Sequence, residues 1–222
     1  MRFIGRFLLL FISLFAMPFI FADSMYTFGE VNSTFTDKPV TLGFVFTSNT
    51  GFNVSSLGWF DATGAGFQSA HTVAIFDSDG NMLTSTTLGT GTSSPLNGWF
   101  RYQAIAPITL EAGATYTLAG TSGGALDSWT ANDYVSGLAV NPAFTVGLDA
   151  ARFFYGPDLV DPESHFSDYL VYSGPNLEGA TVPEPADALL VALGVGMLFA
   201  FRSKASARKS RSRDDARRQK LG

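Results

Sequence analysis

Histidines are the first candidates for acid–base chemistry, and the sequence has two of them, His71 and His165. An imidazole is the group that acts as general base in a Ser-His-Asp arrangement. No Gly-x-Ser-x-Gly nucleophile elbow accompanies these histidines. His71 begins a strand-like run, so we interpret it as a packed, hydrogen-bonded structural histidine. We therefore predict that the protein is not an enzyme.

Two acidic residues, Asp77 and Asp79, are candidates for calcium binding. Residues 77–81 have the spacing of the first half of a calcium loop. The twelfth position is Leu88, whereas a helix-loop-helix calcium site needs a bidentate glutamate there. Asp, Gly and Asn are also typical turn residues, and the segment joins two strand-like runs. We favour a turn and keep a structural calcium ion as the alternative.

A second group of carboxylates lies in and just after the loop of residues 156–166. Its members are Asp158, Asp161, Glu163 and Asp168. Two carboxylates that face each other can hydrolyse a glycosidic bond, and loop carboxylates such as Asp158 and Asp161 can hold calcium. Proximity in the sequence establishes neither arrangement, so we expect a solvated acidic loop. Apart from this possible calcium, we expect no cofactor.

Trp129 is the best candidate for an exposed residue that stacks on a sugar. Its neighbours include Asp127 and Asp133 together with Ser, Thr and Asn, a composition typical of a loop. Carbohydrate binding by these three residues is the first alternative to a structural role. Aromatic residues in a β-sandwich are more often part of the core. A glycoside-active enzyme with paired carboxylates is the second alternative.

Short strand-like runs separated by turn residues must position these groups. They recur between residues 25 and 173, where no long stretch has helical periodicity. This pattern predicts an all-β fold, a jelly-roll-like β-sandwich domain over residues 23–173, followed by a linker over residues 174–182. The predicted strands are residues 40–47, 52–60, 72–76, 82–88, 98–105, 108–110, 115–119, 138–140, 152–155 and 169–172.

Charge and cysteine content exclude several classes of function. Residues 23–182 contain fifteen acidic and three basic residues, a formal net charge of −12, although the whole chain is at −5. Such an acidic domain repels phosphate backbones, so we exclude nucleic acid as a partner. The chain has no cysteine, which excludes disulfides, thiol nucleophiles and zinc–thiolate sites.

The first 22 residues have the composition of a secretory signal peptide. Arg2 and Arg6 precede an apolar run over residues 7–15, and Ala22 is a small residue at the expected cleavage site. We therefore expect export by the general secretion machinery.

The last forty residues have three parts. Val182, Pro183, Glu184 and Pro185 form an extended motif, because proline continues neither a helix nor a sheet ladder. Residues 186–201 are mostly apolar and predict a transmembrane helix about 24 Å long, which spans a bilayer that thins around it. Residues 202–222 form a basic tail that should remain cytoplasmic. The basic residues that we expect to stop translocation are Arg202, Lys204, Arg208, Lys209 and Arg211.

This order of proline motif, apolar helix and arginine cluster resembles the PEP-CTERM sorting signal. The resemblance covers residues 183–222, with Val182 immediately before the Pro-Glu-Pro motif. It implies processing by exosortase, a membrane-embedded cysteine protease-transpeptidase of Gram-negative bacteria that make extracellular polysaccharide. It also implies a transient stay in the inner membrane, and then a place at the cell surface or outside the cell.

A second resemblance covers residues 40–121. These residues are similar to an uncharacterised extracellular β-sandwich family that recurs in PEP-CTERM proteins. The similarity implies a fold but no activity. The residues that carry it are the runs 42–46, 54–60, 71–77, 80–83, 98–102 and 110–118.

These observations together predict an exported structural or binding protein of the cell surface or the biofilm matrix. Extracellular polysaccharide is a possible partner, besides the sorting enzyme, the secretion machinery and the inner membrane.

Overall fold

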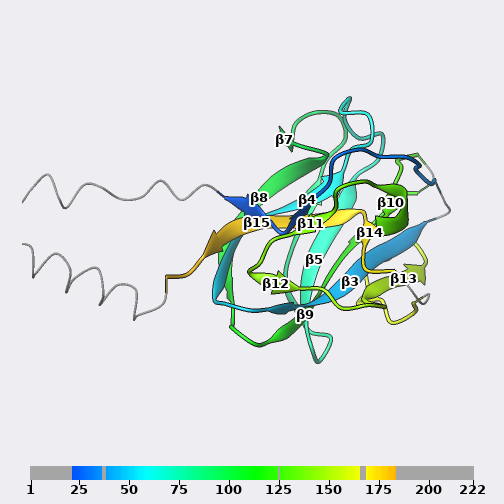
Figure 1. Ribbon diagram of the computed structural model, residues 1–222. Helices are drawn as coiled ribbons and strands as arrows, with labels where there is room; N and C mark the ends of the chain where they lie inside the picture. The colour runs from blue at the N-terminus through cyan, green and yellow to red at the C-terminus, as the bar shows by residue number, and fades with distance from the viewer. Residues whose placement is uncertain (1–21, 37–38, 125, 166–168, 184–222) are drawn as a thin grey trace, which may run out of the picture. The chain divides into compact units, whose positions relative to one another are not determined.

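The computed structural model describes residues 22–36, 39–124, 126–165 and 169–183 (Figure 1). Residues 1–182 form one compact unit, and residues 183–222 form a second unit of which Pro183 is the described residue. The predicted signal peptide before Ala22, the transmembrane helix and the basic tail lie outside the described residues.

The described residues are almost entirely strands and loops, which confirms the all-β prediction. The strands are β1 (Asp23–Ser24), β2 (Tyr26–Thr27), β3 (Val40–Ser48), β4 (Phe52–Phe60), β5 (His71–Asp77), β6 (Met82–Leu88), β7 (Leu96–Asn97), β8 (Phe100–Leu110), β9 (Thr115–Thr121), β10 (Thr130–Ala131), β11 (Ala139–Val140), β12 (Phe144–Thr145), β13 (Ala151–Tyr155), β14 (Tyr172–Ser173) and β15 (Pro175–Thr181). A 3-10 helix, η1 (Asn132–Tyr134), lies between β10 and β11. In this part of the chain, no helix is long and apolar enough to cross a bilayer.

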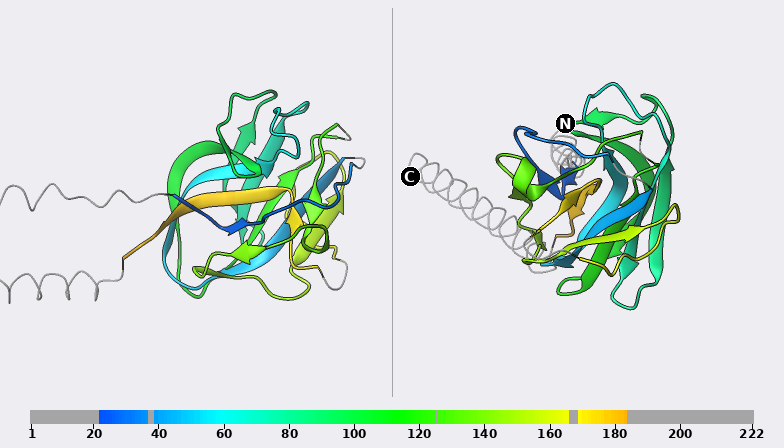
Figure 2. Two further views of the ribbon diagram at one scale, coloured as in Figure 1. Left: turned by 45° about the horizontal axis from the view of Figure 1, so that its top comes forward. Right: turned by 90° about the vertical axis from the view of Figure 1, so that its right-hand side faces the viewer.

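Two antiparallel sheets form the sandwich. The first has the order β1-β15-β4-β8-β7, and the second has the order β12-β3-β9-β5-β6, with β13 also paired to β3. The two sheets curve around a shared core (Figure 2). Two short pairs, β10 with β14 and β11 with β2, lie outside the main sheets.

Aromatic side chains dominate the core between the sheets. Phe44, Phe52, Trp59 and Phe60 are completely buried, and Phe46 is nearly so. Phe, Tyr and Trp each bury about 150–250 Å² of surface, so they make a large contribution to the hydrophobic free energy of folding. A core of this kind stabilises a domain that has no disulfide.

The predicted break between residues 105 and 108 is wrong, because β8 is one continuous strand. Its register against β4 shifts between Val54 and Ser56, which pair with Ile108 and Ala104. Three residues of β8 therefore lie opposite one residue of β4. Pro107 falls inside this bulge, where a strand tolerates a residue that has no N–H to donate.

The predicted linker over residues 174–182 is also wrong. Residues 175–181 are strand β15, which pairs with β1 on one side and with β4 on the other. Asn176 and Leu177 are completely buried, and the Val182 N–H donates to the Gly51 carbonyl oxygen over 2.8 Å. The domain therefore extends to Val182. Gly and Pro in this segment suggested a loop, but Pro175 is the first residue of its strand, where proline is compatible with a sheet.

Strand β1 holds the start of the domain against its end. Asp23 pairs with Gly179 and Ser24 with Glu178. The Glu178 carboxylate is buried and accepts hydrogen bonds from the Asn97 side-chain amide over 2.7 Å and from the Ser24 hydroxyl over 3.3 Å. Burial raises the pKa of Glu178 above its ordinary value, although these two hydrogen bonds oppose the shift.

The position of β15 makes a prediction about the minimal domain. A fragment of residues 23–182 should unfold cooperatively on heating, whereas a fragment of residues 23–173 should show no cooperative transition, because β1 loses its partner strand and β4 loses one of its two neighbours. Circular dichroism during thermal unfolding measures both. Equal melting temperatures for the two fragments would show that β15 is dispensable.

Candidate ligand-binding site

Aromatic side chains from several separate segments surround a pocket of about 160 Å³. The loop before β3, strands β3, β10 and β13, helix η1 and the segment before β14 all contribute to its wall. The lining residues are Phe35, Val40, Leu42, Trp129, Ala131, Tyr134, Phe153, Tyr155, Tyr169 and Tyr172. Most of the lining is apolar, and the size matches roughly one six-membered ring, which is small for a ligand pocket.

Trp129 is held in this pocket by its own backbone. Its N–H donates to the Phe35 carbonyl oxygen over 2.9 Å, and the Phe35 N–H donates back over 2.8 Å. The Trp129 ring lies 5.0 Å from the Phe35 ring and meets the Tyr172 ring edge-on at 5.6 Å. Within the described residues, the Trp129 indole nitrogen is buried and has no hydrogen-bond partner.

The next residues fix the opposite wall. Thr130 and Ala131 form β10, which pairs with Tyr172 and Ser173 of β14. The Asn132 side-chain oxygen accepts the Leu170 N–H over 2.9 Å. Hydrogen bonds to neighbouring segments therefore hold residues 130–132 in place, and these residues need no strong local preference for a strand conformation.

Trp99 marks a second and larger cleft, of about 580 Å³. Residues 22–24, the turn between β7 and β8, and residues 139–142 form its walls. The Trp99 indole N–H donates to the Gly29 carbonyl oxygen over 3.0 Å, and its ring stacks on Phe28. This cleft is more polar than the aromatic pocket, since Asp23, Ser24 and two asparagines line it.

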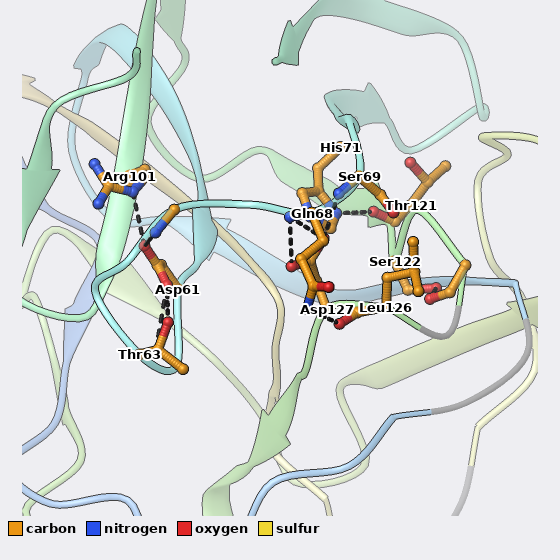
Figure 3. Close-up of polar contacts among 12 residues, drawn as sticks. Asp61, Thr63, Gln68, Ser69, His71, Arg101, Thr121, Ser122, Leu126 and Asp127 are labelled. Atoms are coloured by element: carbon orange, nitrogen blue, oxygen red, sulfur yellow. Dashed lines mark hydrogen bonds and ion pairs between the residues drawn. The ribbon is translucent and has the colours of Figure 1, made fainter. Parts of the chain in front are cut away.

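The side chain of Asp127 links two loops of the domain, and we call this set of contacts the clasp. Its carboxylate accepts the Gln68 N–H over 2.9 Å and the Ser69 N–H over 2.8 Å, and His71 Nε2 lies 3.1 Å away (Figure 3). His71 Nδ1 lies 2.9 Å from the Thr121 carbonyl oxygen. Asp127 therefore joins the loop before β5 to the loop after β9.

His71 is the packed structural histidine that its place in a strand predicted. It is completely buried, and its ring stacks on Trp59 at a centroid distance of 4.8 Å. Burial lowers the pKa of His71 below its ordinary value, while the Thr121 carbonyl and the Asp127 carboxylate oppose the shift.

A buried ion pair between Asp61 and Arg101 organises the same end of the sandwich. Arg101 Nε donates to Asp61 over 2.7 Å (Figure 3). The guanidinium also donates to the carbonyl oxygens of Ser94 and Gly64. The carboxylate also accepts N–H groups, including that of Gly66 over 2.9 Å. Burial by itself raises the pKa of Asp61, but the hydrogen bonds from Arg101 and the backbone together hold it below its ordinary value.

Asp61 and Asp127 both line a small cavity of about 70 Å³. This volume holds about two waters, since each water occupies roughly 30 Å³ in the liquid. Both carboxylates are engaged, one by a guanidinium and the other by backbone N–H groups. The pair therefore has a structural role and offers no room for a sugar ring.

The remaining predicted site residues are dispersed. Residues 77–81 form the turn between β5 and β6, in which Asp77 accepts the N–H groups of Asp79 and Asn81, so the turn prediction is confirmed. Asp133 is exposed and accepts a hydrogen bond from the neighbouring Asn132. The three residues proposed for sugar binding thus have different partners: Trp129 lines the pocket, Asp127 is in the clasp, and Asp133 faces solvent.

The acidic loop brings Asp161 towards the β5–β6 turn. A Cβ atom added to Gly80 would lie 3.5 Å from Asp161 Oδ2. Burial raises the pKa of Asp161, and the negative charges of Glu163 and Asp77 act in the same direction. The side chain of Asp158 is exposed, and its backbone carbonyl accepts the Thr41 hydroxyl over 2.8 Å. Among the described residues, no group of three or more His, Asp or Glu is placed to hold a metal ion.

Sequence reasoning missed the ion pair and the aromatic pocket. One signal for the ion pair was available, because Arg101 is one of three basic residues in the domain and lies between aromatic residues in a strand. A charge in such a run needs a buried partner. The pocket had no comparable signal, since its residues are separated by up to 137 positions, from Phe35 to Tyr172.

Residues 27–171 match a family described as "Domain of unknown function (DUF4082)". The matched residues include β3 to β13 and all the lining residues of the aromatic pocket except Tyr172. No curated protein matches the chain.

The ion pair makes a prediction about stability. Arg101→Met should lower the free energy of unfolding by about 3–5 kcal/mol, because it leaves the Asp61 carboxylate buried without its cation. The combined variant Asp61→Asn with Arg101→Met should lose less than the sum of the two single changes. Urea unfolding of the 23–182 fragment measures all four proteins.

Measuring the free energy of unfolding at acid pH provides the control for this interpretation. The folded pKa of Asp61 is lowered, so the stability due to the pair is complete above its ordinary pKa of 3.8 and is lost as pH falls through the lower folded value. Protonation of Asp61 also removes the unpaired charge in Arg101→Met. The stability difference between the two proteins should therefore narrow in acid, and a constant difference would contradict the ion-pair explanation.

Proposed function

The chain belongs to the DUF4082 family of domains of unknown function, and we propose for it a structural or binding role at the cell surface or in the extracellular matrix. The protein is exported by the general secretion machinery. It is then held in the inner membrane through its C-terminal segment and processed by an exosortase-type enzyme at Pro183-Glu184-Pro185.

The observation that carries this proposal is the pairing of β1 with β15. These strands are antiparallel neighbours, so the beginning of β1 lies beside the end of β15. The start of β1 and the end of β15 consequently lie at the same end of the sheet (Figure 1). The predicted signal-peptide cleavage site and the start of the Pro-Glu-Pro motif therefore lie at one end of the folded domain, which we propose faces the membrane during processing.

The sorting motif follows the folded domain without a spacer. The last strand hydrogen bond is made by Val182, and the motif begins at the next residue. Val182 and Pro183 are exposed, which leaves the start of the motif accessible to another protein. Pro183 lacks an N–H, so it has no donor with which to continue the sheet after β15.

Carbohydrate binding at the aromatic pocket is a second candidate function. The specific observation is that Trp129, the residue selected from the sequence as a sugar-stacking candidate, lies in a pocket with six other aromatic side chains. Flat aromatic faces suit the apolar face of a pyranose ring, and tyrosine hydroxyls can bond to its hydroxyl groups. Extracellular polysaccharide is the ligand class that fits the proposed location.

We assign no catalytic role to the domain. Asp61, Asp127 and Asp77 are committed to an ion pair, a loop clasp and a turn, and the Glu178 carboxylate accepts hydrogen bonds from Asn97 and Ser24. A jelly-roll-like connectivity remains our proposal for the fold, supported by antiparallel neighbours that are far apart in the sequence, such as β15 and β4.

Processing provides the first test. Replacing Pro183, Glu184 and Pro185 with alanine leaves the apolar segment intact, so membrane insertion should persist while shortening and release are lost. Cell fractionation followed by mass measurement of the protein detects both. Alanines at the exposed residues Glu163, Ser164 and His165 are the matched control and should leave release unchanged. Normal release of the motif variant would refute the sorting assignment.

Ligand binding provides the second test. The 23–182 fragment should bind oligosaccharides on a glycan array, and Trp129→Ala should weaken binding about fivefold, because stacking on an aromatic ring contributes on the order of 1 kcal/mol. Trp99→Ala is the matched control, since that ring is also partly buried and packs against the core. Loss of binding in Trp99→Ala alone would move the site to the larger cleft.

A further inference from the structure

The rings that line the aromatic pocket meet at steep angles. Tyr172 meets Trp129 at a centroid distance of 5.6 Å and an interplanar angle of 82°, and it meets Phe153 at 6.4 Å and 77°. Phe35 and Tyr134 meet at 4.8 Å and 76°. Rings that stand nearly perpendicular to one another surround a shared space from more than one direction. The walls of this pocket therefore have the arrangement of an aromatic cage.

Strand β13 separates the aromatic wall from a neighbouring positive charge. Successive side chains of a strand point to opposite faces, so Phe153 and Tyr155 share the face that lines the pocket. Arg152 and Phe154 belong to the other face. The Arg152 guanidinium donates to the Ala151 carbonyl oxygen over 3.0 Å. The nearest arginine along this strand is therefore directed away from the pocket.

The pocket lining offers few hydrogen-bonding groups to a ligand. Among the described residues, no lysine, arginine, histidine, carboxylate or amide side chain lines it, and seven of the ten lining residues are aromatic. A ligand that carries many hydroxyl or N–H groups would leave several of them unpaired here, at a cost in free energy. A quaternary ammonium group carries a positive charge but no N–H, so it leaves no donor unpaired.

We propose that the aromatic pocket binds a quaternary ammonium head group, of the kind that choline and glycine betaine carry. The quadrupole of an aromatic ring attracts a cation to its face, and tryptophan is the strongest of the three ring types in this respect. Trp129 and the tyrosines of the pocket supply such rings. This ligand class goes beyond the two functions proposed above, since it is neither a sorting signal nor a sugar.

The size of the pocket suits this head group. A volume of about 160 Å³ corresponds to about five waters at roughly 30 Å³ each. A trimethylammonium group with its attached carbon has about five non-hydrogen atoms, each of about the size of a water. A hexose has about twice that number, so it would fill the pocket with only part of its ring.

The charge of the domain also favours a cation. Residues 23–182 carry a formal net charge of −12, which raises the local concentration of cations and lowers that of anions. The buried Arg101 is paired with Asp61 and does not reverse this field at the pocket. Binding of the head group should therefore weaken as salt is added, because salt screens the attraction.

The pocket lies away from the two chain ends of the domain. Tyr172 lies just before the start of β15, and Thr181 is at the end of that strand. The pocket and the end of β15 consequently lie at opposite ends of the domain (Figure 1). Ligand binding uses only the folded domain, so it succeeds or fails independently of the proposed sorting and processing.

Calorimetric titration of the 23–182 fragment with choline tests the proposal. The fragment contains every strand of the two sheets, and its thermal transition checks that it is folded. The neutral isostere of choline, in which a carbon atom replaces the nitrogen, is the matched control ligand because it keeps the shape and removes the charge. Choline should bind at least about tenfold more tightly than this isostere, since the attraction to the ring faces requires the charge.

Two neighbouring residues of β13 supply matched protein variants. Tyr155 and Phe154 are exposed to similar extents, 48% and 44%, but Tyr155 lines the pocket whereas Phe154 does not. Tyr155→Ala should weaken choline binding at least about threefold, and Phe154→Ala should leave it unchanged. Tyr155→Phe keeps the ring and loses the hydroxyl, so it should bind choline within about twofold of the original protein.

Three results would overturn the proposal. Equal binding of choline and its neutral isostere would show that the pocket selects only for apolar shape. Unchanged binding in Tyr155→Ala would place the choline site elsewhere, and so would equal losses in Tyr155→Ala and Phe154→Ala. The absence of measurable heat at choline concentrations of tens of millimolar would contradict the proposal directly.

Vesicles of phosphatidylcholine distinguish the two sources of such a head group. If the fragment that binds choline also sediments with these vesicles, and Tyr155→Ala does not, the ligand is a lipid head group. If it binds choline but stays in solution, the ligand is a small soluble compound. Both outcomes support a quaternary ammonium site.

Discussion

The pairing of β15 with β1 and β4 is the constraint on which the rest of the structure depends. It places the C-terminal strand inside the first sheet, beside the N-terminal strand. The same pairing fixes β14, which immediately precedes β15 and holds β10 in register. Trp129 reaches the aromatic pocket because it precedes β10. The two chain ends and the candidate ligand site therefore depend on one set of backbone hydrogen bonds.

A domain without disulfides needs other ways to hold its loops. Here two carboxylates perform this function at one end of the sandwich. Asp61 binds Arg101 and the backbone of its own loop, and Asp127 joins His71 to residues 68–69. Each carboxylate accepts hydrogen bonds from several protein donors in place of water, and these bonds offset the free-energy cost of burying its charge. The loops at this end are therefore fixed by polar groups, while aromatic side chains fill the space between the sheets.

The uneven distribution of charge separates surfaces with different properties. Most acidic residues lie in the turns and loops, whereas the span from Met82 to Leu110 contains Arg101 as its one charged residue. A strongly acidic domain stays soluble and avoids non-specific contact with phosphate-rich partners.

The sequence by itself determined the all-β class, most of the long strands and the turn at residues 77–81, because these depend on local alternation and turn chemistry. It also indicated a buried structural role for His71. Tertiary structure decided the role of residues 175–181, since a segment with Gly and Pro becomes a strand when neighbours on both sides supply hydrogen bonds. It likewise decided that Asp127 and Trp129, two positions apart, have different partners. Contacts between distant segments set these outcomes, and local sequence carries no record of them.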